Sequence, residues 1–302
     1  MTFRLFIYYC ALCGGWAAFL AFVLVQALGI RRPPDEFVPE GRRIVLATLT
    51  SGILGVLLAG AVGAIDALLN AVGSQRLIRV LVCLAVGLLG GLLAGLLGAL
   101  LWELLSVPRF LDWTIVGMVI GASIGVFDLG SALSAGQGPR MALRKVINGV
   151  IGGALGGFVG GLFFVMLEQV RSLPRSSLAT GFVILGVCIG LLIGLAQIIL
   201  KEAWIRVEQG FRAGREMMLS KGAMTIGRSE SSDIGIFGDN AVEKVHARIL
   251  LQGNRYVVAD AGTPSGTFVN DERITQAVPL RSGDQIRIGN NVLRFRERQK
   301  RA

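Results

Sequence analysis

A few polar residues near the C-terminus of this 302-residue sequence have the side chains that can hold a phosphate group. Arg228 follows a glycine, and Lys244 and Ser265 lie farther along the same region. A guanidinium fork and an ammonium group supply positive charge, and a serine hydroxyl supplies a hydrogen-bond donor. These are the side-chain types that recognition of a phosphate group needs.

Catalytic constellations are missing from the sequence. His246 is the only histidine, so neither a catalytic histidine pair nor a histidine-based metal cluster is available. Gly235 and Gly238 lack the strand and helix context of a phosphate-cradling loop. Cys10 and Cys13 form a C-x-x-C in an apolar segment, which we interpret as helix packing, with a redox role as the alternative. We therefore predict a non-enzymatic protein without a cofactor or a metal.

The net charge of +10 raises the question of nucleic-acid binding. The basic residues occur in short loops and along the C-terminal region, without the stripe of Arg and Lys that a nucleic-acid interface requires. Membrane lipid headgroups explain them more simply, so we predict no nucleic-acid partner.

The C-terminal region has the pattern of an all-β sandwich. From Ala203 onward, runs such as AWIRVEQG, RYVVADAG and DQIRIGN alternate apolar and polar residues between turn signals. About a hundred residues are enough for one such core. We predict a β-sandwich domain over residues 203–302, placed directly after an apolar domain over residues 1–202.

At this point the sequence resembles a known family, the forkhead-associated (FHA) domain, over about Ala203 to Arg298. The matching residues, in family order and spacing, are Gly227-Arg228, Asp233-Ile234, His246-Ala247, Asp260, Gly266-Thr267-Phe268-Val269-Asn270, Leu280, Gly283-Asp284 and Ile288-Gly289. The resemblance implies a β-sandwich that in many relatives binds phosphothreonine peptides.

The resemblance also implies roles for individual residues. Arg228 would hold the phosphate, and Lys244 lies where many relatives contact the ligand. The candidate phosphopeptide-binding residues are Arg228, Glu243, Lys244, Ser265 and Asn270. The candidate structural residues of the recognition loops are Gly227, His246, Gly266 and Thr267.

Three positions depart from the family pattern. Glu243 replaces a serine that donates to phosphate, and a carboxylate repels a dianion. Pro264 and Ser265 stand where a polar residue and an asparagine are usual. The sequence thus leaves open phosphothreonine binding through Arg228 and Lys244, phosphate-independent protein or self association, and an internal phosphate mimic in which Glu243 pairs with Arg228.

Before residue 203 the sequence predicts a bundle of membrane-spanning helices. Six segments reach the ~20 apolar residues that a bilayer requires. They are residues 5–30, 44–69, 80–101, 114–133, 146–167 and 179–200. We interpret the first as a retained helix and not as a signal peptide.

These segments repeat along the chain. Arg79, Gly87, Gly91, Gly95 and Glu103 align at one constant offset with Arg144, Gly152, Gly156, Gly160 and Glu168. Gly55, Ala59, Gly63 and Asp66 likewise correspond to Gly117, Gly121, Gly125 and Asp128, and then to Gly186, Gly190, Gly194 and Gln197. We predict three tandem two-helix repeats that pack through glycine faces.

Ionisable residues inside such segments are costly and often mark ion paths. Asp66, Asp128 and Gln197 form the candidate polar path, and Glu103 and Glu168 are further acids of the segments. We interpret the four acids as interfacial anchors or salt bridges near helix ends. A path for a transported solute is the alternative.

Together these features predict a membrane-anchored signalling or scaffolding protein whose FHA-like domain binds a protein partner. The alternative is a small-solute or ion transporter or channel regulated by that domain. Six helices place both termini on one side, and the basic residues slightly favour the cytoplasmic side of a bacterial membrane. The sequence also allows a homo-oligomer.

Overall fold

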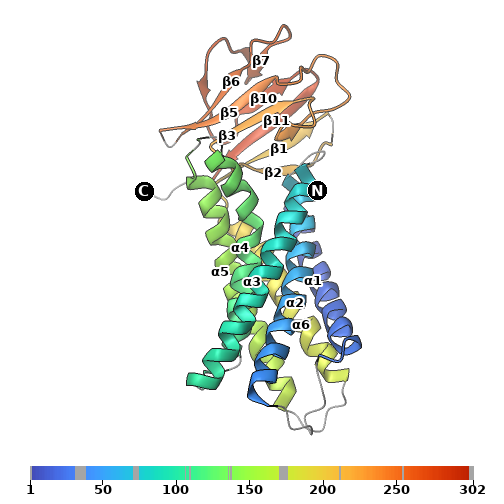
Figure 1. The fold of residues 1–302 in the computed structure, drawn as a ribbon. Helices are drawn as coiled ribbons and strands as arrows, with labels where there is room; N and C mark the ends of the chain where they lie inside the picture. Colours follow the sequence, from blue (N-terminus) through green and yellow to red (C-terminus); the bar gives the residue numbers. More distant parts are fainter. Residues whose placement is uncertain are drawn as a thin grey trace.

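The computed structural model describes residues 2–30, 39–70, 75–105, 107–108, 110–134, 136, 138–169, 176–210, 212–253 and 255–298. A bundle of long helices stands end to end with a β-sandwich (Figure 1). The helices are α1 (Phe3–Ala27), α2 (Glu40–Asn70), α3 (Gln75–Leu105), α4 (Phe110–Ser134), α5 (Arg140–Gln169) and α6 (Ser176–Ile199). All six are long enough and apolar enough to cross a membrane.

Several helices extend beyond the apolar segments that predict them. Helix α3 begins at Gln75 and not at Val80, and α5 begins at Arg140 and not at Val146. Arginine and lysine are good helix formers, so charge does not end a helix. As a result Arg79 and Lys145 lie on helices, where their side chains can point into the bundle.

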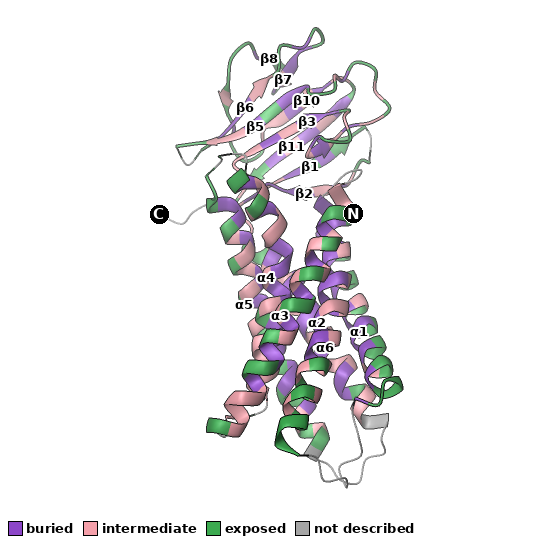
Figure 2. Ribbon diagram, viewed as in Figure 1, coloured by how far each residue is buried: buried purple, intermediate pink, exposed green. Residues whose placement is uncertain are grey.

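The six helices close into a ring. Each helix packs on its neighbours in the order α1, α2, α3, α4, α5, α6 and back to α1, and α2 also contacts α4. The apolar windows of α2, α4 and α6 are 44–67% buried, against 28–39% for the other three. The even-numbered helices therefore form the inner wall of the bundle (Figure 2).

Glycines let each inner helix approach an outer helix backbone to backbone. A Cβ atom on Gly55 would overlap the carbonyl of Gly87, and one on Gly117 would overlap that of Gly153. A Cβ atom on Gly186 would overlap the carbonyl of Gly14, which closes the ring between α6 and α1. Close backbone approach through small residues is the usual source of helix association in lipid.

The inner helices contribute side chains at equivalent heights. Three apolar layers are each 2% exposed or less: Leu54, Val116 and Leu185; Leu58, Ile120 and Ile189; and Val62, Ile124 and Ile193. They belong to one apolar cluster. The next positions toward the sandwich are Asp66, Asp128 and Gln197, which are also buried. The core is therefore apolar along most of its length and polar at the end nearest the sandwich.

The sandwich contains two sheets. One has the order β2 (Glu216–Met218), β1 (Ala203–Gln209), β11 (Asn291–Glu297), β10 (Gln285–Ile288), β7 (Thr267–Val269) and β8 (Glu272–Arg273). The other has the order β4 (Ile234–Gly235), β3 (Ala223–Gly227), β5 (Ala247–Gln252), β6 (Arg255–Asp260) and β9 (Val278–Pro279). The predicted order of six helices followed by a β-sandwich is confirmed.

Alternation along the strands builds the core of the sandwich. Ile205, Phe295 and Ile226 are fully buried, while neighbouring residues point to solvent. Strands β1 and β11 pair antiparallel, with Ala203 opposite Glu297. The first and last strands of the sandwich therefore lie side by side above α6. Residues 299–302 of the predicted domain lie outside the described residues.

Arginines of the sandwich cap two of the inner helices. Arg215 donates from Nη2 to the carbonyl of Leu69 (2.8 Å) at the end of α2. Arg298 donates from Nη1 to the carbonyl of Ile199 (2.7 Å) at the end of α6. The last carbonyls of a helix lack intrahelical donors and carry partial negative charge, which a guanidinium satisfies. Burial lowers the pKa of Arg215 to about 10, so it stays charged at neutral pH.

Candidate functional site

Two loops bring the expected phosphate-binding side chains together. Arg228 directly follows β3, and its backbone N–H donates to the carbonyl of Glu243 (2.9 Å). The next N–H, of Ser229, donates to the carbonyl of Lys244 (3.2 Å). Arg228 and Lys244 are both exposed. The fold therefore sets two cationic side chains on adjoining, solvent-facing loop segments.

His246 joins this pair of loops to a third. The buried imidazole accepts from the backbone N–H of Glu243 at Nδ1 (3.1 Å), so its proton is on Nε2. Nε2 lies 3.2 Å from the carbonyl of Gly266, in the loop between β6 and β7. Gly266 has φ +69°, a conformation that glycine adopts without strain. His246 thus braces the recognition loops, as the resemblance implies.

Ser265 and Asn270 are engaged within the protein. The Ser265 hydroxyl donates to the carbonyl of Ala241 (2.6 Å) and so ties two loops together. The Asn270 amide donates to Asp284 Oδ1 (3.0 Å) and accepts from the N–H of Gln285 (2.9 Å). Both side chains stabilise loop conformation here. Neither role is visible in the sequence, because each depends on a contact between separate loops.

Glu243 and Arg228 share a backbone hydrogen bond without a side-chain ion pair. Within the described residues no carboxylate oxygen of Glu243 comes within 4.0 Å of the Arg228 guanidinium. The geometry therefore gives no support to the internal phosphate mimic.

Gly227 lies where the two loop segments approach each other most closely. A Cβ atom there would overlap the carbonyl of Lys244.

Asp260 organises the loop that follows β6. Its carboxylate accepts from the hydroxyls of Thr267 (2.7 Å) and Thr263 (2.9 Å), and from the N–H groups of Thr263 and Gly262 (2.8 Å each). Partial burial raises the pKa of Asp260, but these hydrogen bonds to the charged form outweigh it and hold the pKa below its ordinary value. The Thr267 hydroxyl therefore helps to fix the conformation of this loop.

Asp260→Asn should lower the free energy of unfolding of the sandwich by roughly 1–2 kcal/mol at neutral pH, because an amide accepts fewer and weaker hydrogen bonds. A carboxylate with a depressed folded pKa stabilises above its unfolded pKa, and this contribution is lost as pH falls through the folded pKa. The difference between the variant and the parent should accordingly shrink in acid. Denaturant unfolding at neutral and acidic pH measures it, with the exposed Asp271→Asn as an unaffected control.

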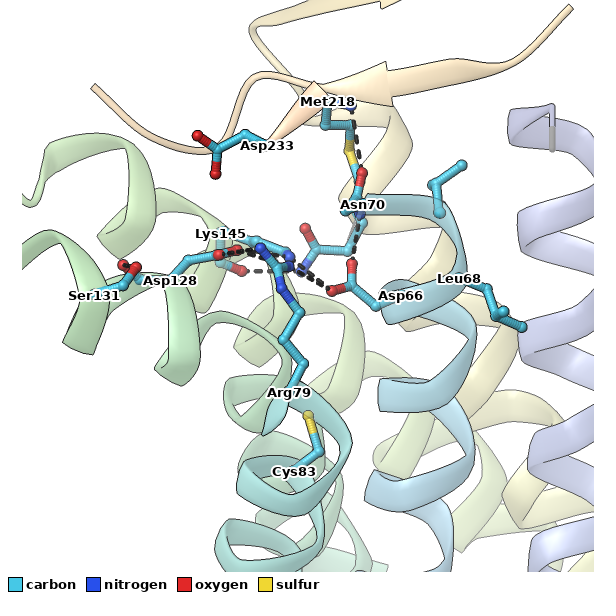
Figure 3. Close-up of polar contacts among 12 residues, drawn as sticks. Asp66, Leu68, Asn70, Arg79, Cys83, Asp128, Ser131, Lys145, Met218 and Asp233 are labelled. Carbon is cyan, nitrogen blue, oxygen red and sulfur yellow. Dashed lines mark hydrogen bonds and ion pairs between the residues drawn. The ribbon is translucent and has the colours of Figure 1, made fainter. Parts of the chain in front are cut away.

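A second group of polar side chains lies at the end of the bundle nearest the sandwich (Figure 3). Lys145 Nζ donates to Asp66 Oδ2 (2.8 Å) and to Asp128 Oδ2 (2.9 Å). Arg79 Nη2 donates to Asp128 Oδ1 (2.7 Å), and Arg79 Nη1 lies 3.5 Å from Asp66 Oδ2. We call these four residues the charge cluster. All four side chains are at most 5% exposed.

The charge cluster is electrically balanced. Two carboxylates face an ammonium and a guanidinium, so the buried group carries no net charge and its oxygens are hydrogen-bonded. Gln197 donates to the carbonyl of Lys145 (2.9 Å) from α6. The three residues of the predicted polar path therefore meet in one place, together with two cations that sequence reasoning did not include.

The salt-bridge interpretation of Asp66 and Asp128 agrees with the structure. They are paired in the interior, because Arg79 and Lys145 point inward from the extended starts of α3 and α5. The sequence repeat already relates these two cations, because Arg79 aligns with Arg144, the residue next to Lys145. Glu103, at the opposite end, pairs with Arg43 (3.4 Å) and fits the salt-bridge interpretation.

Within the described part of the chain, the interior of the bundle beneath the charge cluster is mainly apolar. The three apolar layers described above lie directly beneath the charge cluster, from Val62 down to Leu54 on α2. Toward the sandwich, a cavity of about 40 Å³ borders Lys145 and Gln197, with Met218 and Ser220 on its other wall. That volume holds about three or four waters at about 10–15 Å³ each. The cluster is thus nearer to water on the sandwich side.

The described residues contain no group of three His, Cys, Asp or Glu able to hold a metal.

Comparisons with known proteins match the C-terminal third of the chain. The FHA domain family matches residues 224–289. The glycogen accumulation regulator GarA of Mycolicibacterium smegmatis is 36% identical over 94 residues, covering 31% of this chain and 58% of GarA. The oxoglutarate dehydrogenase inhibitor of Corynebacterium jeikeium is 36% identical over 101 residues, covering 33% of this chain and 69% of the inhibitor.

A solved chain from work on phosphothreonine-dependent FHA domain interactions is 26% identical, with a TM-score of 0.30, and covers 33% of this chain and 100% of its own length. The chain spans little more than half the length of GarA, so the likeness extends to one domain. The Corynebacterium inhibitor, in contrast, is matched over more than two thirds of its length. With the family match to residues 224–289, this shows that the chain belongs to the family of FHA domain proteins.

Proposed function

We propose that this protein is a multi-pass membrane protein whose FHA domain binds a phosphothreonine-containing protein partner on the cytoplasmic side. The observation that carries the proposal is the pairing of exposed Arg228 and Lys244 on loops braced by His246. Two cations beside exposed loops are suited to a dianionic phosphate. The study of phosphothreonine-dependent FHA interactions supports the same chemistry.

The proposal includes the organisation of the bundle. Residues 1–202 would form the membrane domain, built from three two-helix repeats, and residues 203–302 the FHA domain. The equivalent glycine contacts of Gly55, Gly117 and Gly186 support the repeats, as do the equivalent apolar layers. The bundle would act as an anchor, because its core beneath the charge cluster is apolar and offers no path for a polar solute.

Arg228→Ala should weaken phosphothreonine binding at least tenfold, because a charge-assisted hydrogen bond contributes about 1.5–3 kcal/mol. The measurement is calorimetry on the full-length protein in lipid nanodiscs, with a phosphothreonine peptide selected from a library and its unphosphorylated form. Arg248→Ala is the control, an exposed arginine within β5 and outside the recognition loops. Equal binding of both peptide forms, with Arg228→Ala silent, would instead establish phosphate-independent association.

Glu243→Ser should have the opposite effect. The substitution removes a half-buried carboxylate beside Arg228 and supplies a hydroxyl donor. We expect several-fold tighter binding of the phosphorylated peptide and no change for the unphosphorylated one. Equal or weaker binding of the phosphorylated peptide would show that Glu243 does not limit affinity.

A further inference from the structure

The sandwich covers the charge cluster directly. The backbone N–H of Met218, on β2, lies 3.4 Å from Asn70 Oδ1, and Asn70 Nδ2 donates to Asp66 Oδ1 (2.7 Å). A chain of hydrogen bonds thus connects the sandwich backbone to the cluster. Figure 3 shows Met218 and Asp233 on the sandwich side of the cluster, with Asp66 and Asp128 beneath them.

Polar contacts hold this cover at the ends of the helices. Arg215 and Arg298 cap α2 and α6, and Glu202 pairs with Arg144 of α5. Water can replace the exposed contacts of Arg298 and Glu202 at modest cost, because surface ion pairs and solvated hydrogen bonds contribute about 1 kcal/mol or less. The hydrogen bond from Arg215 is buried and costs more to break. The glycine contacts inside the bundle have no such substitute. The interface also contains apolar contacts, because Met218 packs in the apolar cluster of the bundle and Met141 of α5 packs in that of the sandwich. Water therefore has access to the edge of the interface through its exposed polar contacts.

Separation also changes the environment of the buried charges. Ions removed from water carry a large desolvation cost, which their pairing only partly offsets. The 40 Å³ cavity already places Lys145 and Gln197 at the edge of the interface. Lifting the sandwich would let water reach the cluster and hydrate its charges, so opening recovers part of the free energy lost with the polar contacts.

The loop that carries Arg228 belongs to the same cover. Its Ser231 carbonyl accepts from Gln75 Nε2 (3.3 Å) at the start of α3, the helix that bears Arg79. Its Asp233 pairs with Lys221 (2.8 Å), before β3. The recognition loop therefore lies against the bundle at the helix that supplies a cation to the cluster.

We propose that the sandwich is a lid on the charge cluster, and that its seating through Arg215 and Arg298 controls whether water reaches the cluster. This inference does not depend on phosphothreonine binding, because it concerns contacts within the chain.

Cys83 provides a reporter for the lid. It lies one helical turn past Arg79 on α3, is 3% exposed, and donates from Sγ to the carbonyl of Ser123 (3.5 Å). Water that reaches the cluster comes within one turn of this thiol. Cys188 serves as its control, because it lies about midway along α6 and away from the interface.

The experiment uses the full chain in lipid nanodiscs with Cys83 as the single cysteine, made by replacing Cys10, Cys13 and Cys188 with alanine. We expect Arg215→Ala with Arg298→Ala to raise the rate of Cys83 modification by a small water-soluble methanethiosulfonate at least tenfold. Arg298→Ala alone should raise it less. Arg296→Ala, an exposed arginine on β11, should leave it unchanged.

A parallel chain with Cys188 as the single cysteine distinguishes lid opening from unfolding. The lid is supported if Cys83 reacts faster while Cys188 does not. It is overturned if the Cys83 rate equals that of the parent in both arginine variants, if Arg296→Ala raises it equally, or if Cys83 and Cys188 accelerate together.

Discussion

Replacing Lys145 with methionine should lower the free energy of unfolding of the bundle by about 3–5 kcal/mol, the usual cost of removing one partner from a buried ion pair. Lys145 Nζ holds Asp66 and Asp128 at 2.8 and 2.9 Å. Without it, two buried carboxylates share only the Arg79 guanidinium, and one negative charge is uncompensated. The measurement is thermal unfolding in nanodiscs, together with equilibrium unfolding in mixed detergent.

A second substitution separates the charge effect from the loss of packing. Asp66→Asn added to Lys145→Met leaves Arg79 paired with Asp128 (2.7 Å) and restores neutrality. We expect the double variant to be more stable than Lys145→Met alone. Arg144→Met is the matched control: this neighbour is 40% exposed and its ion pair with Glu202 should contribute about 1 kcal/mol or less. Equal losses for Lys145→Met and Arg144→Met would contradict the prediction.

Gly121→Ala should cost about 3 kcal/mol or more, the upper part of the range for overpacking a core. Its Cβ atom would overlap the carbonyl of Gly149 on α5, and backbone atoms cannot move aside as a flexible side chain can. Helices α4 and α5 would have to separate, which also disturbs Asp128 and Lys145 one to two turns away. The loss of the thermal transition, or its shift to lower temperature, reports the effect.

Gly130→Ala is the control on the same helix. Gly130 is exposed, and no atom lies within 4 Å of the position its Cβ would take. Alanine favours the helix by about 1 kcal/mol over glycine, so this variant should be neutral or slightly more stable. If both glycines tolerate alanine equally, the close packing of α4 on α5 is not what holds the bundle together.

The order of elements and the glycine faces follow from sequence because each depends on local periodicity. Gly55, Ala59 and Gly63 recur every four residues, as a helix face requires, and strands such as β1 alternate clearly. The charge cluster was only half predicted. Asp66 and Asp128 stand out within apolar segments. The expected segments begin at residues 80 and 146 and leave out Arg79 and Lys145, because an apolar threshold ends a segment where charge begins.

The recognition loops show a different limit of prediction from sequence. Arg228 and His246 keep the family spacing, so their places could be predicted. Ser265 and Asn270 could not be interpreted correctly, because a hydroxyl or an amide at a loop position looks available until its partner is known. Their partners, Ala241 and Asp284, lie in other loops, and only the folded chain brings them together.

The contact between Gln75 and Ser231 holds the loop that carries Arg228 close to the end of the helix bundle. If the helices span a bilayer as proposed, Arg228 lies within a few residues of the headgroups. A freely diffusing partner would have to present its phosphothreonine on a short protruding segment to approach so near a surface. A partner tethered in the same bilayer would search in two dimensions and at a raised effective concentration. The low intrinsic affinity that Glu243 would cause is then sufficient to bind a partner in the same membrane. It is too low to bind a partner that diffuses in solution.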